Sequence, residues 1–98
     1  MALRESQKKY LRGMGHQLKP VITIGGAGIT DSLRREFDAT IAHHELIKVR
    51  VRTGDRESRD EAIRQLCEDS GAELVTRIGN VALVFLKNPD QPKIPLPS

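Results

Sequence analysis

The sequence predicts one α/β (α+β) domain whose elements follow the order α-β-α-β-α-β-β. Apolar residues recur every three or four positions in the segments expected to be helices, and they alternate or cluster in the shorter segments expected to be strands. A chain of 98 residues buries only about two-thirds of its unfolded surface, so one core is expected rather than two. We therefore expect residues 1–98 to form a mixed four-stranded sheet packed by helices.

The first expected helix covers residues 4–14. Its apolar stripe consists of Tyr10, Leu11 and Met14, followed by Leu18. Pro20 then favours extended backbone, because a residue that precedes proline avoids the helical conformation. Residues 21–24 are therefore predicted to form a short strand.

The second expected helix follows a glycine-rich turn and ends at about His43, and Thr30 or Asp31 can cap its first turn. Its buried face should contain, at four-residue spacing, Leu33, Phe37 and Ile41. The sequence His43-His44-Glu45 could suggest a metal or acid–base site, but consecutive helical residues point about 100° apart and cannot all face one ion. We interpret it as a helix end, where protonated histidines suit the negative pole of the helix dipole.

Residues 46–52 form the clearest predicted strand, because apolar and cationic side chains alternate along it. The face expected to point toward the core carries Ile47, Val49 and Val51. The opposite face carries Lys48, Arg50 and Arg52. A solvent-facing strand needs polar side chains, but folding does not require all of them to be cationic, so the pattern indicates a binding surface.

A third helix is expected over about residues 56–70, with Ser58 and Glu61 at capping-box spacing and Gly71 just beyond its end. Cys67 lies on the apolar stripe of this helix, and we interpret it as a buried structural thiol. It is the only cysteine, so no intramolecular disulfide can form.

Two further strands are expected at residues 73–78 and 81–87, joined by Gly79-Asn80, a two-residue hairpin signal. The second of them is apolar without alternation, so we expect it to be central and covered on both faces. The proline-rich tail, residues 88–98, should be extended rather than helical.

The net charge of +3 is unevenly distributed. Residues 1–52 hold ten Lys/Arg against five Asp/Glu, a net of +5, whereas residues 53–98 hold six against eight, a net of −2. This asymmetry suggests a polyanionic partner. The N-terminal region has no apolar run typical of a signal peptide, and no stretch approaches the roughly 20 residues of a membrane span, so we expect a cytoplasmic protein without membrane attachment.

The glycine turn Gly25-Gly26-Ala27-Gly28 has several interpretations. A dinucleotide-binding fingerprint would need a third glycine at Asp31, and a phosphate loop of the nucleotide-hydrolase kind would need lysine at Ile29, before Thr30. Two readings remain. The turn is either a GxxG loop, which lets a nucleic-acid backbone approach a helix start, or a plain strand-to-helix connection.

The cations Lys48, Arg50 and Arg52 of the predicted strand favour the interpretation of the turn as a nucleic-acid-binding loop. Alternate residues of a strand lie about 6.5–7 Å apart, close to the phosphate repeat of an extended nucleic-acid strand. Further candidate contacts are Arg34, Arg35, Lys19, Arg12 and Lys8, with Arg4 one turn before Lys8. Aromatic residues make up only 3% of the chain, so backbone and shape recognition of structured RNA is expected rather than aromatic base stacking.

Three motifs in order carry a resemblance to a known family. They are Leu11-Arg12-Gly13 with His16-Gln17-Leu18-Lys19-Pro20, then Ile24-Gly25-Gly26-Ala27-Gly28-Ile29-Thr30, then His43-His44-Glu45-Leu46-Ile47-Lys48-Val49. The sequence closely resembles the CRM (chloroplast RNA splicing and ribosome maturation) domain family, and over nearly its whole length it is similar to the stand-alone bacterial YhbY-like members. The resemblance implies a fold like the C-terminal domain of translation initiation factor three. It also implies association with precursors of the large ribosomal subunit, with residues 25–28 as the family's glycine loop.

The expected function is therefore that of a monomeric RNA-binding protein with no enzymatic activity and no cofactor, acting on ribosomal RNA in ribosome biogenesis. A protein-interaction module that uses residues 88–98 and a generic RNA chaperone-like binder are the alternatives. A small hydrolase or nucleotide-binding enzyme would bind a mononucleotide at the glycine turn, and we expect no such binding.

Overall fold

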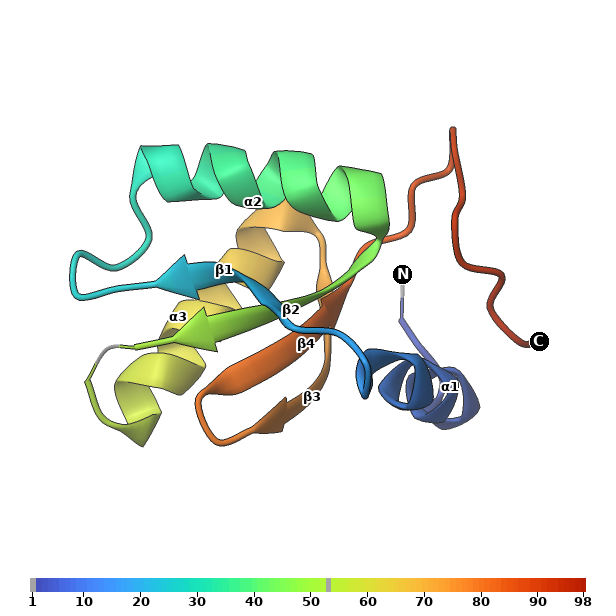
Figure 1. Ribbon diagram of the computed structural model, residues 1–98, viewed down its shortest axis with the longest axis horizontal. Helices are drawn as coiled ribbons and strands as arrows, with labels where there is room; N and C mark the ends of the chain where they lie inside the picture. Colours follow the sequence, from blue (N-terminus) through green and yellow to red (C-terminus); the bar gives the residue numbers. More distant parts are fainter. Residues whose placement is uncertain (1, 53) are drawn as a thin grey trace.

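The computed structural model describes residues 2–52 and 54–98. Its elements are α1 (Glu5–Gly15), β1 (Pro20–Ile24), α2 (Asp31–His44), β2 (Leu46–Val51), α3 (Arg56–Ser70), β3 (Glu73–Ile78) and β4 (Val81–Phe85). Figure 1 shows them in sequence order from blue to red. The order α-β-α-β-α-β-β and the mixed α/β class are confirmed, and each boundary lies within two residues of the predicted one.

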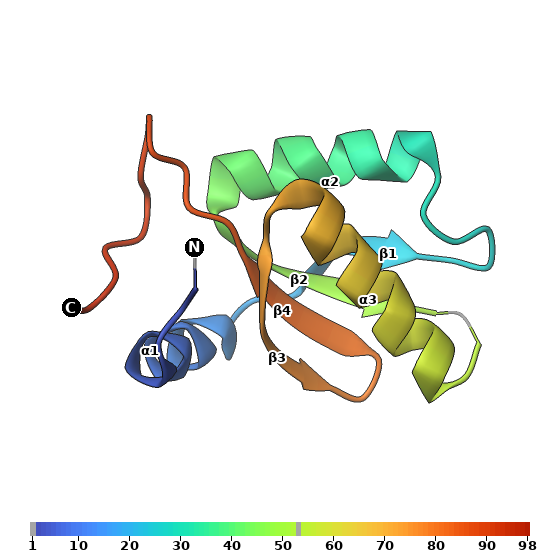
Figure 2. The same cartoon turned by 180° about the vertical axis from the view of Figure 1, so that it is seen from behind.

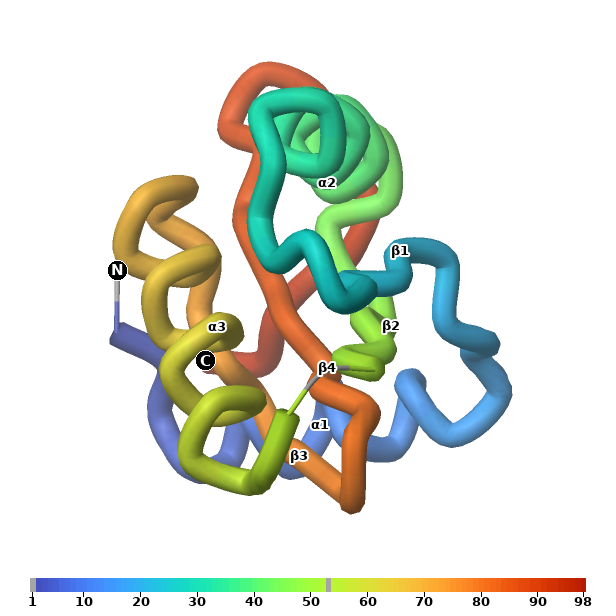
Figure 3. The backbone as a smooth tube through the Cα atoms, turned by 90° about the vertical axis from the view of Figure 1, so that its left-hand side faces the viewer, coloured from blue at the N-terminus to red at the C-terminus, as the bar shows by residue number. Residues whose placement is uncertain are grey.

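The sheet has the strand order β1-β2-β4-β3, with β4 between β2 and β3 (Figure 3). β1 pairs with β2 in parallel, whereas β4 pairs antiparallel with both β2 and β3, so the sheet is mixed as predicted. β4 is central and buried on both faces, which explains why its sequence does not alternate.

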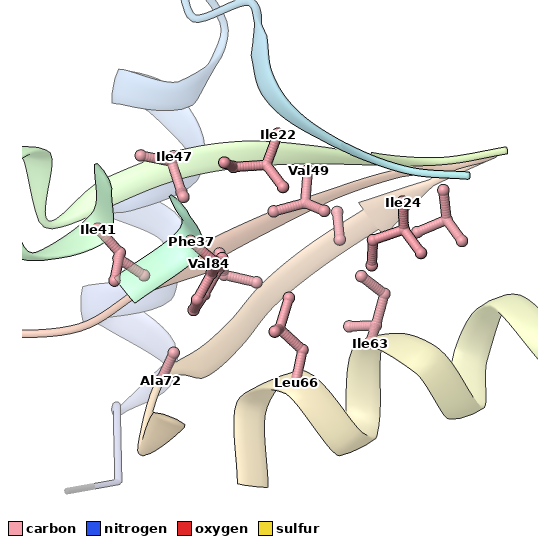
Figure 4. Close-up of a cluster of buried hydrophobic side chains, with 12 residues drawn as sticks. Ile22, Ile24, Phe37, Ile41, Ile47, Val49, Ile63, Leu66, Ala72 and Val84 are labelled. Carbon is pink, nitrogen blue, oxygen red and sulfur yellow. The ribbon is translucent and has the colours of Figure 1, made fainter. Parts of the chain in front are cut away.

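The main hydrophobic core lies between the sheet and helices α2 and α3. Phe37 and Ile41 enter it from α2, and Ile63 and Leu66 enter it from α3 (Figure 4). The strands contribute Ile22, Ile24, Ile47, Val49, Val51, Ala82 and Val84. The alternation of β2 therefore directs its apolar side chains toward α2 and α3, as predicted, and its cationic side chains toward the other face.

The second face of the sheet is partly covered by α1 and the C-terminal tail (Figures 1 and 2). A smaller cluster there contains Leu3, Leu11, Leu46, Val75, Leu83 and Phe85, with Ile94 and Leu96 packed against it. α1 approaches the sheet so closely that a Cβ atom at Gly15 would lie 2.7 Å from Cδ2 of Leu83. Gly15 is therefore a point of close packing.

The apolar stripe predicted on α1 is only partly buried. Leu11 is fully buried, but Tyr10, Met14 and Leu18 are 40%, 39% and 36% exposed. The reason is that α1 contacts the sheet through Leu11 and Gly15, four residues apart, which leaves the neighbouring flank open. The spacing identifies the stripe but not the portion that the sheet covers.

The helix ends agree with the sequence at two of three predicted caps. Thr30 caps α2, since its Oγ1 accepts a hydrogen bond from the N–H of Leu33 at 3.1 Å. Gly71 ends α3 in the left-handed conformation, with φ of 83°. The predicted pairing of Ser58 with Glu61 at the start of α3 is wrong, because Asp55, the residue directly before the helix, accepts from the N–H of Ser58 at 2.9 Å.

The proline-rich tail contains no helix, as predicted, but it bends at residues 89–91 and at 94 rather than running extended throughout. It is anchored by the carboxylate of Glu45. Glu45 lies just after α2, is fully buried and has φ of 65°, a strained conformation for a residue with a side chain. Its Oε1 accepts the N–H groups of Lys93 and Ile94 at 2.6 and 2.7 Å, and its Oε2 accepts that of Asn88 at 2.6 Å. Burial acts to raise the pKa of Glu45, but these three donors and Lys87 outweigh it and hold that pKa below its ordinary value.

Candidate nucleic-acid interface

The cations of β2 lie on the sheet face that also carries α1. Lys48 is directly opposite Leu83 on β4, and Arg50 is opposite Val81. Lys48 is half-buried and Arg50 is exposed, so both charged groups can reach solvent. Arg52 follows β2, and its N–H donates to the carbonyl of Ile24 at 2.8 Å, at the point where β1 leads into the glycine turn.

A groove of about 300 Å³ crosses this face between the end of α1 and the β3–β4 hairpin. Its lining combines cations with apolar and small residues: Arg12, Gly15, His16, Pro20, Lys48, Arg50, Thr76, Ile78, Val81 and Leu83. Three candidate cations from two distant segments of the sequence, Arg12 on α1 and Lys48 and Arg50 on β2, thus meet at one site.

These cations are not neutralised within the protein. Among residues 2–52 and 54–98, the ion pairs involve Arg34, Arg64 and Arg77, and none involves the three cations of the groove. Among the described residues, no carboxylate lines the groove either. Positive charge that is unpaired and gathered in a concave surface attracts a polyanion.

The glycine turn provides an accessible backbone at the start of α2. It is closed by a hydrogen bond of 3.0 Å from the N–H of Gly28 to the carbonyl of Gly25, and Gly28 has φ of 74°, which favours glycine. A Cβ atom at Gly25 or Gly26 would meet nothing within 4 Å, so the space around the turn is open. A phosphate could therefore approach the backbone closely there.

The surroundings of the turn are charged differently on its two sides. Toward α3, Gly28 and Ile29 share a shallow depression with Glu57 and Glu61. Their carboxylates oppose a phosphate on that side, although Glu61 forms an ion pair with Arg64. The favourable approach for an anion is from the β2 side, where Arg52 lies.

Arg34 and Arg35 occupy α2, on the opposite side of the sheet from the groove. The Nε of Arg34 pairs with Asp38 at 2.9 Å, and its Nη2 donates to the carbonyl of Asp69 at 2.7 Å. Arg34 thus joins α2 to the end of α3. Arg35 is exposed on α2, the helix that begins beyond the glycine turn.

Lys8 and Lys19 lie at the margins of the groove. Lys8 is half-buried one helical turn before Arg12 and shares its face of α1. Lys19 is exposed and directly precedes Pro20, which lines the groove. The structure therefore gathers Arg12, Lys48 and Arg50, flanks them with other predicted cations, and separates them from Arg34.

Sequence reasoning missed the rest of the groove lining. His16 directly follows α1, whereas Thr76 and Ile78 lie on β3, and the sequence does not indicate that they meet. Gly15 offered a signal, because a glycine near a helix end can mark close packing. Cys67 packs against the main core but is only half-buried, not fully buried as predicted. Burial and the charge of Glu73 raise the pKa of its thiol to about 11.

No group of His, Cys, Asp or Glu side chains within residues 2–52 and 54–98 could hold a metal ion. In the same part of the chain, no helix is both long and apolar enough to cross a membrane.

The fold and these surfaces define a class of small α/β domain, with a glycine turn before a helix and a cationic sheet face. The chain belongs to the CRS1 / YhbY (CRM) domain family, whose model matches residues 3–85. The resemblance found in the sequence is thereby confirmed.

Similar proteins include one from Pseudomonas aeruginosa named as a probable RNA-binding protein, with 40% identity over 91% of this chain and 86% of that one. A Haemophilus influenzae protein named as an RNA-binding protein is 38% identical over 97% of this chain and 95% of its own. A solution structure from Staphylococcus aureus, described as a candidate RNA-binding protein, has a TM-score of 0.83 and 32% identity. The match covers 98% of this chain and all of that one.

Proposed function

We propose that this protein binds structured RNA through the groove and the glycine turn, and that it acts as a monomer on ribosomal RNA in precursors of the large ribosomal subunit. The single observation that carries the RNA proposal is the meeting of Arg12, Lys48 and Arg50 in a groove whose described lining contains no carboxylate. The names of the relatives support RNA as the polyanion. The ribosomal target rests on the family resemblance of the sequence.

The geometry favours contact with an RNA backbone. A cationic row leads from the groove to the glycine turn, formed by Lys48 and Arg50 on β2 and by Arg52 directly after it. One strand of RNA lying along this row would place successive phosphates near successive cations. Its next phosphate would reach the open backbone at Gly25 and Gly26.

The protein-interaction alternative is less well supported. It would use the proline-rich tail, but the apolar side chains of Ile94 and Leu96 already pack against the second cluster. The backbone of the tail is also occupied, by the hydrogen bonds to Glu45 and by one from Nε2 of Gln7 to the carbonyl of Pro97 at 3.0 Å.

The RNA proposal is tested by the salt dependence of binding. Each phosphate contact contributes about 0.7–0.9 to the slope of log affinity against log salt, so Arg50→Ala should flatten this slope by that amount. Arg64→Ala is the matched control, because Arg64 is equally an arginine but is paired with Glu61 and Glu68 on α3. An unchanged slope in Arg50→Ala would remove Arg50 from the site, and equal flattening in both variants would make the effect nonspecific.

The ribosomal proposal is tested by sedimentation of a lysate through a sucrose gradient. The wild-type protein should comigrate with large-subunit precursors, and Gly26→Glu should move to the top because it adds a negative charge where the turn would meet phosphate. Ala39→Glu, on the exposed surface of α2, controls for the added charge and should still comigrate. A wild-type protein that stays at the top at every salt concentration would leave a generic RNA binder.

A further inference from the structure

The lining of the groove contains more than phosphate binding requires. Its floor is apolar, formed by Leu83 and Val81 of the central strand, and one wall is the bare backbone of Gly15. A site that only attracts phosphate needs cations and hydrogen-bond donors, which hydrated surface side chains supply. The apolar floor therefore calls for a second kind of contact.

Ile78 strengthens this argument. It is 75% exposed, the largest value among the exposed large hydrophobic residues described, and it lies on β3, at the edge of the sheet and the rim of the groove. An exposed apolar residue on an edge strand favours unwanted association, and proteins normally place charged residues there. An isoleucine beside a groove is better explained by a ligand that covers it.

The register of β3 directs Ile78 and Thr76 to the groove. Leu74 pairs with Val84 and Thr76 pairs with Leu83, so one extra residue, Val75, is accommodated by a bulge. The bulge brings Thr76 onto the groove face, whereas Leu74 lies on the α3 side of the sheet. The groove wall is thus a consequence of strand geometry.

Resting on the RNA binding proposed above, we propose that the groove holds the base of one unpaired nucleotide, with its phosphates at Arg12, Lys48 and Arg50. A nucleotide combines a flat, largely apolar base with anionic phosphate, which matches an apolar floor beside cations. The volume of about 300 Å³ is at the lower end of the range for ligand pockets, about 300–1,000 Å³.

Base-paired RNA does not fit this site equally well. Its bases are stacked and hidden, so it offers a surface of phosphates and sugars and cannot reach the floor at Leu83. An unpaired base can be splayed out and packed against apolar side chains, here Leu83, Val81 and Ile78, while the cations of the groove contact its phosphates. His16 and Thr76 carry polar groups that can meet the base edge.

The test compares two RNA probes that differ only in their bases. One is a pool of hairpins with a stable stem and a nine-nucleotide loop of randomised sequence, and the other has the same stem with an abasic ribose-phosphate loop. Both probes have the same number of phosphates. The wild-type protein should bind the base-bearing pool about fivefold or more tightly than the abasic hairpin, the lower limit for the contribution of one packed base.

Ile78→Thr should bring this ratio close to one and leave the salt slope unchanged, because it removes apolar contact and no cation. The substitution keeps a β-branched side chain at an exposed position, so the strand should still form. Leu74→Thr is the matched control on the other face of the same strand, where Leu74 is 40% exposed, and it should keep the wild-type ratio.

The outcomes separate this proposal from RNA binding itself. A wild-type protein that binds both hairpins equally overturns the base site and leaves RNA binding intact. Equal loss of the ratio in both variants also overturns it, because the effect would not belong to the groove. A wild-type protein that binds neither hairpin overturns RNA binding and, with it, the base site.

Discussion

Replacing Glu45 with glutamine should weaken the hydrogen bonds that hold the C-terminal tail against the domain. The carboxylate accepts three backbone N–H groups, from Asn88, Lys93 and Ile94, while its side chain is fully buried. In Glu45→Gln one of the two acceptor oxygens becomes an NH₂ group. If the remaining oxygen keeps Lys93 and Ile94, this NH₂ faces the N–H of Asn88, and two donors then oppose each other.

The loss of stability in Glu45→Gln can be worked out from the strengths of these hydrogen bonds. Bonds to a charged acceptor stabilise by about 1.5–3 kcal/mol each and neutral ones by about 0.5–1.5 kcal/mol. The exchange weakens two bonds and removes the third, and the relief of no longer burying a charge offsets part of the loss. We expect the free energy of unfolding to fall by about 2–4 kcal/mol. This corresponds to about 10–30 °C in Tm for a domain of this size.

The effect should depend on pH. Because the pKa of Glu45 is lowered in the folded protein, its contribution is complete above the ordinary value of 4.5 and is lost as the pH falls through the folded pKa. Urea denaturation should therefore show wild type and Glu45→Gln far apart near pH 7 and converging below pH 4.5. At pH 7 the amides of Lys93 and Ile94 should also exchange hydrogen faster in the variant.

Glu36→Gln is the matched control, because Glu36 is an exposed carboxylate on α2. It should change stability by no more than about 0.5 kcal/mol. A comparably small loss in Glu45→Gln, or a loss that does not shrink with falling pH, would refute the role of Glu45 in holding the tail.

Three further predictions concern the remainder of the fold. Thr30→Ala should lower the free energy of unfolding, measured by denaturant titration, by about 1 kcal/mol, because it removes the cap of α2. Thr30→Ser keeps a hydroxyl group and should not lower it, so equal stability of the two variants would contradict the cap. Gly13→Ala should be more stable than Gly15→Ala by about 1–3 kcal/mol, because only at Gly15 does a Cβ atom collide with Leu83; the reverse order in thermal melts would refute this packing. At neutral pH, Cys67 should react with iodoacetamide about a hundredfold more slowly than an unperturbed thiol, because its pKa is raised from 9.0 to about 11. Reaction at the unperturbed rate would show that the thiol is accessible.

The helices and strands, and the direction in which the side chains of β2 point, could be predicted because they depend on local sequence patterns. Alternation in residues 46–51 identifies which side chains point to the core, and this pattern needs no knowledge of the rest of the chain. The continuous apolar sequence of β4 likewise predicted correctly that this strand is central in the sheet. Prediction of the cap on α3 failed because Asp55 and Ser58 are both good capping residues three positions apart, and the helix boundary decides between them.

The groove could be predicted only in part. Its cations were found individually, as Arg12 on α1 and as Lys48 and Arg50 on β2, but their meeting depends on how α1 packs on the sheet. The presence of Thr76 and Ile78 in the groove depends on the bulge at Val75, and the sequence gives no clear signal of this bulge. The pairing of Arg34 with Asp69 depends in the same way on the approach of α2 to α3.

The central position of β4 also governs when the molecule can take shape during synthesis. β4 is the last of these four strands in the sequence, yet it lies between β2 and β3, which do not pair with each other. Both hydrophobic clusters require it, since Ala82 and Val84 complete one, and Leu83 and Phe85 complete the other. A nascent chain that ends before residue 81 lacks the strand that joins β2 to β3, so it cannot form the continuous four-stranded sheet. The floor of the groove belongs to the same strand, so the nascent protein gains its stable fold and its groove at the same late moment.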